Sequence, residues 1–370
     1  MTLFDKPSHK ATRPNATISD VAKLAGVSSA TVSRVVNGDS KVRGATQDKV
    51  KAAIEALGYV PNLAARNLAS ARRARVGVIY NNPSATYLSA LLLGAMDQSA
   101  SHGAELLMIK CQFGDPESER AAVERVVASS LDGVLLPSPS GEHSLVIELL
   151  IQHGLPVVAA GGGRAQFGIS CVCVDDRAAS AEMTRYLLEL GHRRIGFIKG
   201  HPSHQSSVER LAGFEEAIAA CPGASAVVVQ GRYTFDSGLA AAEEILDSPQ
   251  KLTAIFASND DMAAATISVA HRRGLVVPAD LTVVGYDDVE TATNLWPPLT
   301  TVRQPVSAIA ATAIDILLRD IRAVSQQAPI SRVEMILPYE LVTRQSAAPP
   351  PTLAVAQRAN GVLVQGQGGR

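Results

Sequence analysis

The stretch ATISDVAKLAGVSSATVSRVVN, residues 16–37, sets the fold of the N-terminal part of the chain. Thr17 followed by Asp20 is typical of a capping box, in which a hydroxyl and a carboxylate satisfy N–H groups at a helix start. Gly26 ends this helix, because glycine adopts the left-handed backbone of a tight turn. Ser28 is placed to cap a second helix, whose apolar stripe is Val32, Val35 and Val36. The pattern predicts two helices joined by a glycine turn.

A third helix follows and stops at Gly58. Its apolar residues recur at helical spacing on one face: Val50, Ala53, Ile54 and Leu57. Three short helices with a glycine turn between the first two are the pattern of a helix-turn-helix unit.

The charge of the chain is divided unevenly. Residues 1–75 hold thirteen of the 34 Lys and Arg but only five of the 35 Asp and Glu, although the net charge is −1. A basic end on an acidic body indicates that the end binds a polyanion. An unstructured basic tail would lack the apolar periodicity seen here.

Composition excludes several classes of protein. No apolar run reaches the roughly 18 residues of a membrane span, and no signal peptide is recognisable at the start. The four cysteines form no CxxC pair, which argues against a metal site or a disulfide framework. We therefore expect a cytoplasmic protein without metal, cofactor or membrane contact.

The N-terminal motifs resemble the headpiece of LacI/GalR-family transcription regulators. The resemblance rests on residues 16–22, 25–28, 31–37 and 58–62, which match in register. It implies that the second helix enters the major groove of an operator. The expected contacts to bases or phosphates come from Thr17, Ser28, Ser29, Ala30, Thr31, Ser33, Arg34 and Asn37. Arg34 is the long donor on that face and is suited to guanine.

Residues 61–69 match the hinge helix of the same family. Two turns of helix are too short to be stable alone in water. The resemblance implies that this helix orders on the operator and inserts Leu68 into the minor groove, with Ala65 allowing close approach and Asn62 as the cap. An ordinary linker helix is the alternative interpretation.

From residue 76 onward, short β-branched runs alternate with helical patterns. Examples of the predicted strands are 76–80, 157–160, 254–257 and 282–286. Alternating strands and helices predict doubly wound parallel sheets with right-handed crossovers. About 270 residues is large for one such sheet, so we expect two lobes.

The body motifs extend the resemblance and imply a two-lobed, periplasmic-binding-protein-like fold. We expect an arm at 1–15, a DNA-binding domain at 16–61, a hinge at 62–74, and an effector-binding and dimerisation domain at 75–345. The family topology implies crossings near residues 174, 302 and 334. Lobe 1 is then 75–174 with 303–333, and lobe 2 is 175–302 with 334–345. Proline and glycine in residues 346–370 predict a disordered tail instead of a tetramerising coiled coil.

An effector site is expected between the lobes, beyond the carboxyl ends of the strands. Arg210, Asn259 and Asp287 match positions that bind sugar hydroxyls in family members. Further candidates are Asn81, Tyr87, His204, Tyr233 and Trp296, of which the last two would stack on a sugar ring.

These observations predict a homodimeric repressor that a small sugar or sugar derivative releases from a pseudo-palindromic operator. Two alternatives remain open: a co-repressor-dependent regulator, and a DNA-binding module whose body only dimerises. An enzyme is disfavoured, because no nucleophile or acid–base pair stands out.

Overall fold

The computed structural model describes residues 17–36, 43–57, 73–162 and 168–351. The chain divides into two compact units, Met1–Arg73 and Ala74–Arg370. Each unit is described by itself. Within the described residues, no helix combines the length and the apolar character needed to cross a membrane.

The N-terminal unit contains the three predicted helices, α1 (Ile18–Ala25), α2 (Ser29–Val36) and α3 (Gly44–Leu57). The capping box at α1 is confirmed: the N–H of Thr17 donates to Asp20 Oδ2 at 2.9 Å, and the N–H of Asp20 donates to Thr17 Oγ1 at 3.3 Å. Gly26 ends α1 with φ of +66°. The small core of the unit consists of Val21, Ala22, Val32, Val50 and Ala53.

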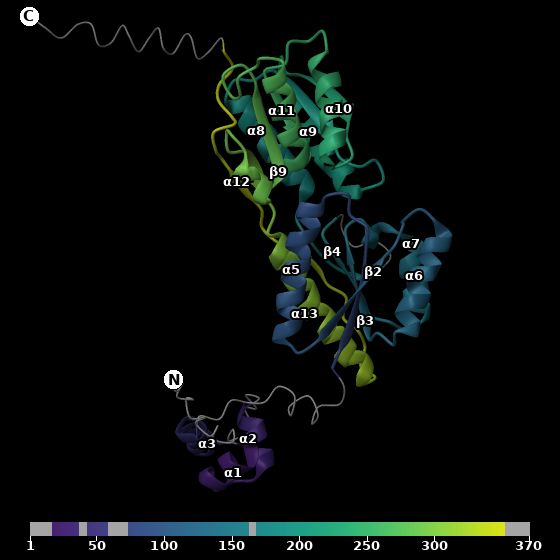
Figure 1. Ribbon diagram of the computed structural model, residues 1–370, viewed down its shortest axis with the longest axis vertical. Helices are drawn as coiled ribbons and strands as arrows, with labels where there is room; N and C mark the ends of the chain where they lie inside the picture. The colour runs from purple at the N-terminus through teal and green to yellow at the C-terminus, as the bar shows by residue number, and fades with distance from the viewer. Residues whose placement is uncertain (1–16, 37–42, 58–72, 163–167, 352–370) are drawn as a thin grey trace, which may run out of the picture. The chain divides into compact units, whose positions relative to one another are not determined.

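Lobe 1 of the C-terminal unit is a six-stranded sheet in the order β11-β5-β4-β3-β1-β2. All of its pairings are parallel. The strands are β1 (Arg75–Tyr80), β2 (Glu105–Lys110), β3 (Gly133–Pro137), β4 (Val157–Ala160), β5 (Ser170–Cys173) and β11 (Glu334–Ile336). Helices α5 (Ala85–Ser101) and α13 (Val306–Ser325) cover one face of this sheet (Figure 1). Helices α6 (Pro116–Ala128) and α7 (Ser144–Gln152) cover the other.

Lobe 2 repeats the arrangement with the order β12-β10-β9-β8-β6-β7. Its strands are β6 (Arg194–Lys199), β7 (Ser225–Gln230), β8 (Ala254–Ala257), β9 (Thr282–Asp287), β10 (Thr300–Arg303) and β12 (Glu340–Val342), of which β12 pairs antiparallel to β10. Helices α8 (Asp176–Glu189) and α9 (Gln205–Ala219) pack on one face. Helices α10 (Phe235–Leu246) and α11 (Asp260–Arg272) pack on the other, and the short α12 (Glu290–Asn294) follows β9. The predicted two-lobed, doubly wound α/β body is confirmed.

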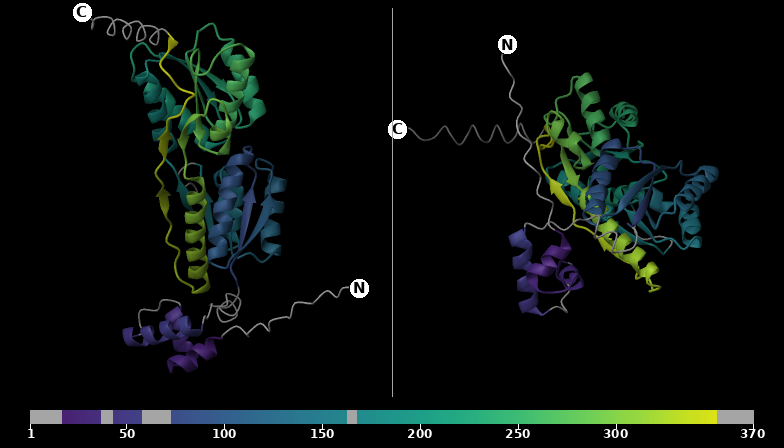
Figure 2. Two further views of the ribbon diagram at one scale, coloured as in Figure 1. Left: turned by 60° about the vertical axis from the view of Figure 1, so that its left-hand side comes forward. Right: turned by 60° about the horizontal axis from the view of Figure 1, so that its bottom comes forward.

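The third crossing between the lobes lies further along the chain than residue 334. Strand β11 pairs in parallel with β5, with Met335 opposite Val172, so residues 334–336 belong to lobe 1. The chain reaches lobe 2 only after Ile336, where β12 joins β10; the β11 and β12 arrows can be followed in Figure 2. The local sequence did not reveal this, because a three-residue strand carries no sign of which sheet it joins.

The segment after β12 corrects the prediction of a tail that begins at 346. Ser346 is fully buried, and its Oγ donates to the carbonyl of Val283 at 2.6 Å and accepts from the N–H of Thr300 at 2.8 Å. The carbonyl of Ala348 accepts from His192 Nε2 at 2.9 Å. Residues 346–348 are therefore part of lobe 2. Residues 352–370 and the predicted arm at 1–15 lie outside the described residues.

Candidate functional site

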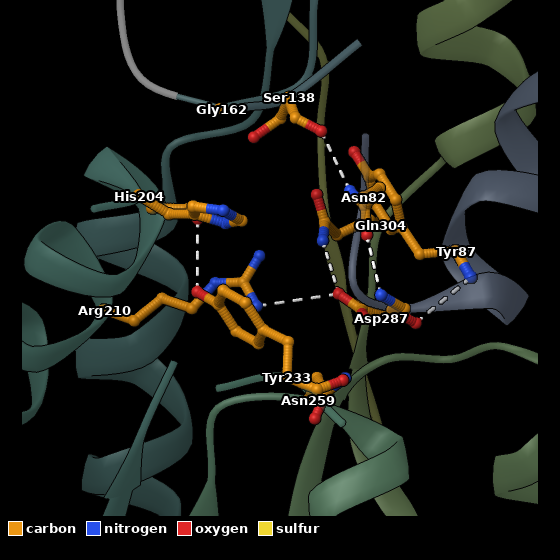
Figure 3. A pocket seen from close by; sticks show the side chains of 12 residues that line it. Asn82, Tyr87, Ser138, Gly162, His204, Arg210, Tyr233, Asn259, Asp287 and Gln304 are labelled. Atoms are coloured by element: carbon orange, nitrogen blue, oxygen red, sulfur yellow. Dashed lines mark hydrogen bonds and ion pairs between the residues drawn. The ribbon is translucent and has the colours of Figure 1, made fainter. Parts of the chain in front are cut away.

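A pocket lies between the two lobes and is lined from both of them (Figure 3). Its lining is polar and aromatic: Asn82, Ser84, Tyr87, Ser138, Gly162, His204, Ser206, Arg210, Tyr233, Asn259, Asp287 and Gln304. Most of these side chains follow the carboxyl end of a parallel strand or open the helix after it. That is where the sheet backbone ends and polar groups converge on a ligand.

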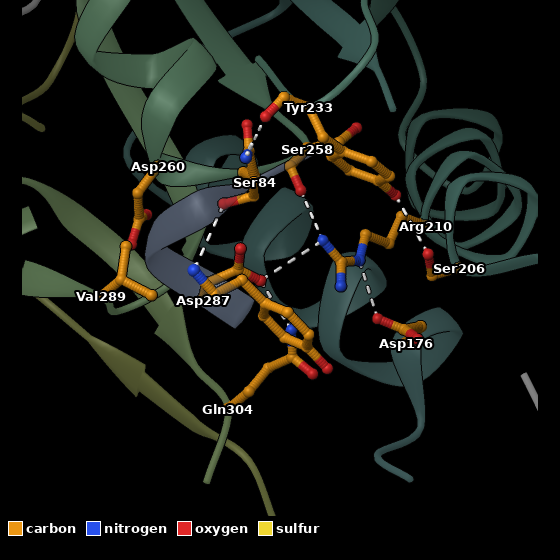
Figure 4. A network of polar contacts seen from close by, with 12 residues as sticks. Ser84, Asp176, Ser206, Arg210, Tyr233, Ser258, Asp260, Asp287, Val289 and Gln304 are labelled. Carbon is orange, nitrogen blue, oxygen red and sulfur yellow. Dashed lines mark hydrogen bonds and ion pairs between the residues drawn. The ribbon is translucent and has the colours of Figure 1, made fainter. Parts of the chain in front are cut away.

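Arg210 of α9 is the central charged group of the pocket (Figure 4). Its Nε donates to Asp176 Oδ1 at 2.7 Å and its Nη1 donates to the carbonyl of Ser258 at 2.5 Å. Nη1 also lies 3.6 Å from Asp287 Oδ1, and Cζ lies 3.6 Å from the ring centroid of Tyr286. The side chains of Asp176 and Asp287 therefore both face this buried cation, and its guanidinium plane is held over an aromatic ring.

Asp287 ends β9 in a strained conformation. Its φ is +114°, which non-glycine residues rarely adopt, and such strain gathers at functional sites. Gln304 Nε2 donates to Asp287 Oδ1 at 2.6 Å. Burial raises the pKa of Asp287 to about 7, against the opposing effect of the nearby Arg210 guanidinium. The group is thus poised between a carboxylate that accepts and a carboxyl that donates hydrogen bonds.

Asp260 fixes the loop behind Asp287. The carboxyl is fully buried; Oδ1 accepts from Thr301 Oγ1 at 2.6 Å and Oδ2 accepts from the N–H of Val289 at 3.0 Å. Burial raises the pKa of Asp260 well above its ordinary value. Together these contacts tie the end of β9 to β10 and hold the unusual backbone of Asp287 in place.

Tyr233 forms an aromatic wall of the pocket and is also held in a left-handed conformation, with φ of +64°. Its carbonyl accepts from Asn259 Nδ2 at 3.0 Å, and its Oη lies 3.1 Å from Ser206 Oγ. A Cβ at Gly200 would lie 2.0 Å from Tyr233 Cζ, so this position requires glycine. The ring is positioned before any ligand arrives.

His204 lies next to this wall, with its ring centroid 5.5 Å from that of Tyr233. Burial lowers the pKa of His204 to about 3, and the charges of His201, His143 and Arg210 add to the effect. The imidazole is therefore neutral near pH 7. Among the lining side chains that the structure describes, Arg210 is then the only cation. Its guanidinium already contacts the carboxyl groups of Asp176 and Asp287.

The structure brings six of the eight predicted effector residues together at this pocket: Tyr87, His204, Arg210, Tyr233, Asn259 and Asp287. Asn259 has a second task, because its Oδ1 accepts from the N–H of Met262 at 3.0 Å and caps α11. Its amide therefore positions Tyr233 and α11 as well as facing the pocket.

Asn81 and Trp296 are not among the residues that line this pocket. Asn81 is exposed, whereas the Nδ2 of its neighbour Asn82 donates to the carbonyl of Ser138 at 2.8 Å at the pocket wall. Trp296 is 80% exposed. The preceding Leu295 packs against the lobe 2 core in extended backbone, so the next side chain points away from it.

Six further lining residues are not among the predicted site residues: Asn82, Ser84, Ser138, Gly162, Ser206 and Gln304. A signal for three of them existed, because Asn82 follows β1, Ser138 follows β3 and Gln304 follows β10 directly. The rule that ligands bind at the carboxyl ends of strands applies to lobe 1 as well as to lobe 2. Among the described residues, no group of His, Cys, Asp or Glu side chains is arranged to hold a metal ion.

In the headpiece, α2 presents Ser29 and Arg34 as exposed side chains. Ser28 caps α2, since its Oγ accepts from the N–H of Thr31 at 3.2 Å, and Thr17 caps α1. Arg34 is the only Lys or Arg on this helix. The side chains of Ala30 and Ser33, and residues Asn37, Asn62, Ala65 and Leu68, lie outside the described part of the chain.

Known protein families match both units of the chain. The family of bacterial regulatory proteins of the lacI type matches residues 17–62, and the periplasmic binding protein-like domain matches residues 184–347. Catabolite control protein A of Priestia megaterium is 34% identical over 337 residues, covering 90% of this chain and 99% of that protein.

Solved structures are similar over the same span. A complex of the transcriptional regulator CelR with cellobiose has 32% identity and a TM-score of 0.66, covering 90% of this chain and 100% of that one. The lac repressor dimer bound to operator and the anti-inducer ONPF has 28% identity and a TM-score of 0.67, covering 90% and 99%.

A helix-turn-helix headpiece with a two-lobed binding body defines a DNA-binding protein that responds to a ligand. The chain belongs to the lacI family of bacterial regulatory proteins. It is a sequence-specific DNA-binding regulator of transcription. Two further relatives are named as an HTH-type transcriptional regulator, at 35% identity, and an HTH-type transcriptional repressor, at 33% identity.

Proposed function

We propose that this regulator represses transcription as a homodimer on a pseudo-palindromic operator and that a small, uncharged sugar or sugar derivative releases it. The observation that supports this most is the pocket between the lobes, with Arg210, Asn259 and Asp287 beside the ring of Tyr233. Hydroxyl groups need donors and acceptors side by side, and these residues supply both. The CelR–cellobiose complex is a precedent for a sugar effector on this fold.

The charge of the lining favours an uncharged ligand. Arg210 already pairs with Asp176 and faces Asp287, and His204 is neutral because its pKa is lowered to about 3. A phosphate or carboxylate on the ligand would find no unpaired cation there, and desolvating it would be unfavourable. Sugars without an ionised group avoid this cost.

The effector acts through linkage between two sites. A ligand that favours one arrangement of the lobes changes operator affinity by some factor, and operator changes ligand affinity by the same factor. Such coupling is usually about 1–3 kcal/mol. We propose that the DNA contacts come from Ser29, Ala30 and Arg34 of α2 and from Leu68 of the hinge. We also propose that the protein acts in the cytoplasm.

The decisive experiment selects genomic DNA fragments with the purified protein, with and without pentoses, hexoses, disaccharides and their phosphorylated forms. We expect a two-fold symmetric site that one uncharged sugar releases. A site that appears only with a sugar would reverse the sign to co-repression. Symmetric sites that no sugar affects would contradict the sugar proposal. Arg34→Ala serves as the control, because it should weaken DNA binding and leave the pocket unchanged.

A further inference from the structure

Two neighbouring carboxyl groups at the end of β9 have different partners. Asp287 and Asp288 both have left-handed backbone, with φ of +114° and +56°. The side chain of Asp287 faces the pocket. The carboxylate of Asp288 instead meets the guanidinium groups of Arg303 and Arg344, and Asp288 is absent from the pocket lining. Asp288 therefore makes its contacts away from the ligand site.

The contacts of Asp288 are close, and its side chain is only 5% exposed. Arg303 Nε donates to Asp288 Oδ2 at 2.7 Å, and Arg344 Nη2 lies 2.7 Å from Oδ1. Arg344 is itself fixed, because its Nη1 donates to the carbonyl of Leu299 at 2.7 Å and its N–H donates to Thr300 Oγ1 at 2.8 Å. Breaking either pair would leave a poorly solvated charge, so the carboxylate and the backbone that carries it stay in place.

The two arginines belong to chain segments next to the crossings between the lobes. Arg303 is the last residue of β10, directly before the chain crosses to α13, and Arg344 follows β12, after the third crossing. Gln304, the next residue after Arg303, is bonded to Asp287 twice. Its N–H donates to the Asp287 carbonyl at 3.2 Å, and its Nε2 donates to Oδ1 at 2.6 Å. By holding Arg303, Asp288 therefore also holds this hydrogen-bond donor against Asp287.

The left-handed backbone at Asp287 needs such support. Non-glycine residues rarely adopt this conformation, and it persists where the surrounding contacts impose it. Asp260 supplies part of the support through the N–H of Val289. The contacts of the Asp287 carboxylate itself are with pocket groups, for which ligand hydroxyls would compete. The ion pairs of Asp288 lie outside the pocket, so a ligand leaves them intact.

Building on the function proposed above, we propose that Asp288 is a positioning residue of the effector site, whose ion pairs with Arg303 and Arg344 aim the Asp287 carboxylate at the effector. A binding group that must first be ordered loses affinity, so a group held in place beforehand binds more tightly. Breaking the ion pairs therefore weakens effector binding without removing any group that touches the effector. It also exposes the Asp287 carboxyl to water, which lowers its pKa from about 7 toward the ordinary value of 3.8.

The first test needs no ligand and uses Arg303→Gln, which separates positioning from simple charge. Removing a cation near a carboxyl raises the pKa of that carboxyl by charge alone, whereas loss of position exposes Asp287 to water and lowers its pKa. The titration of Asp287 is followed by NMR of the carboxyl carbon in the full chain and is assigned with Asp287→Asn. We expect its midpoint to fall from about 7 toward 3.8 in Arg303→Gln. A midpoint that rises or stays unchanged would overturn the proposal.

Glu340→Gln is the matched control for this titration. It removes the other ion partner of Arg303, whose Oε2 lies 2.6 Å from Nη1 and whose side chain is 65% exposed, and leaves Asp288 paired. The midpoint of Asp287 should stay as in the wild type. The charged or titratable groups that face Asp287 from other helices are unaltered in both variants: Arg210, Asp176, Asp260 and Asp261.

The second test measures binding of D-glucose, D-ribose and cellobiose by calorimetry. Asp288→Asn keeps the size of the side chain and suits left-handed backbone, so it removes the charge alone. For any of these sugars that the wild type binds, Asp288→Asn and Arg303→Gln should each raise Kd about ten-fold, the scale of one hydrogen bond to a charged group. Glu340→Gln should bind as the wild type does. An unchanged Kd in Asp288→Asn or in Arg303→Gln would refute the positioning role. If the wild type binds none of the sugars, the proposed effector class fails, while the titration of Asp287 still decides the role of Asp288.

Discussion

Arg210 and Asp176 form a buried ion pair, with Nε 2.7 Å from Oδ1 and both side chains at most 6% exposed. Asp176 begins α8 and Arg210 lies in α9, so this pair joins the two helices on one face of the lobe 2 sheet at the floor of the pocket. The pair therefore links the packing of lobe 2 to the geometry of its ligand site.

Asp176→Ala should lower the free energy of unfolding by about 3–5 kcal/mol, because it leaves the buried Arg210 without its main partner. The matched control is Glu216→Ala, which breaks the exposed ion pair with Arg177 between the same two helices. That change should cost at most about 1 kcal/mol. Urea unfolding of both variants makes the comparison, and equal losses would show that Arg210 does not depend on Asp176.

Asp287 should make stability fall as pH rises. Its pKa is about 7 in the folded protein against an ordinary value of 3.8, so between these pH values unfolding releases a proton and higher pH favours the unfolded state. The effect is complete above about pH 7 and absent below about pH 4. His204 acts in the opposite direction below its ordinary pKa of 6.5, because its folded pKa is about 3.

Asp287→Asn isolates the carboxyl from these other groups. The free energy of unfolding of the wild type minus that of Asp287→Asn should decrease between pH 5 and pH 8. Urea unfolding at several pH values measures this difference. A difference that stays constant would show that the pKa of Asp287 is not raised.

Deleting residues 346–370 should destabilise lobe 2 by about 3 kcal/mol, while deleting 352–370 should not. The longer deletion removes the bonds of Ser346 to Val283 and Thr300 and of Ala348 to His192, and leaves buried groups unpaired. Thermal or urea unfolding of the two truncated chains is the measurement. Equal stabilities would mean that residues 346–351 contribute nothing to the fold.

Arg34→Ala should weaken operator binding by about 1–3 kcal/mol and relax the base preference at one position, because Arg34 is the long donor of α2. Lys51→Ala on α3 is the control, since this exposed residue lies outside the helix expected in the major groove. Binding to operator variants over a range of salt concentrations separates base contact from charge. A uniform loss across all variants would assign Arg34 to a phosphate.

Local chemistry made much of this fold predictable. The capping box of Thr17 and Asp20, the turn at Gly26 and the strand at Val157–Ala160 depend on residues close together in the chain, and all three were predicted. The likeness to a known family then placed Arg210 and Asp287 near one another before any contact was visible. A family motif is matched by sequence order alone, which is why these predictions were available.

Orientation and distant pairing were decided by the tertiary structure alone. Which of Asn81 and Asn82 faces the pocket depends on how the chain leaves β1, and Trp296 points outward because Leu295 packs inward. Asp261 meets Ser84 across 177 positions of sequence, and Ser346 meets Val283 across 63. Periodicity and helix caps depend on residues close together in the chain, so the sequence alone determined them. The distant contacts form only after the two sheets have folded and packed, because only then are these groups within hydrogen-bonding distance of each other.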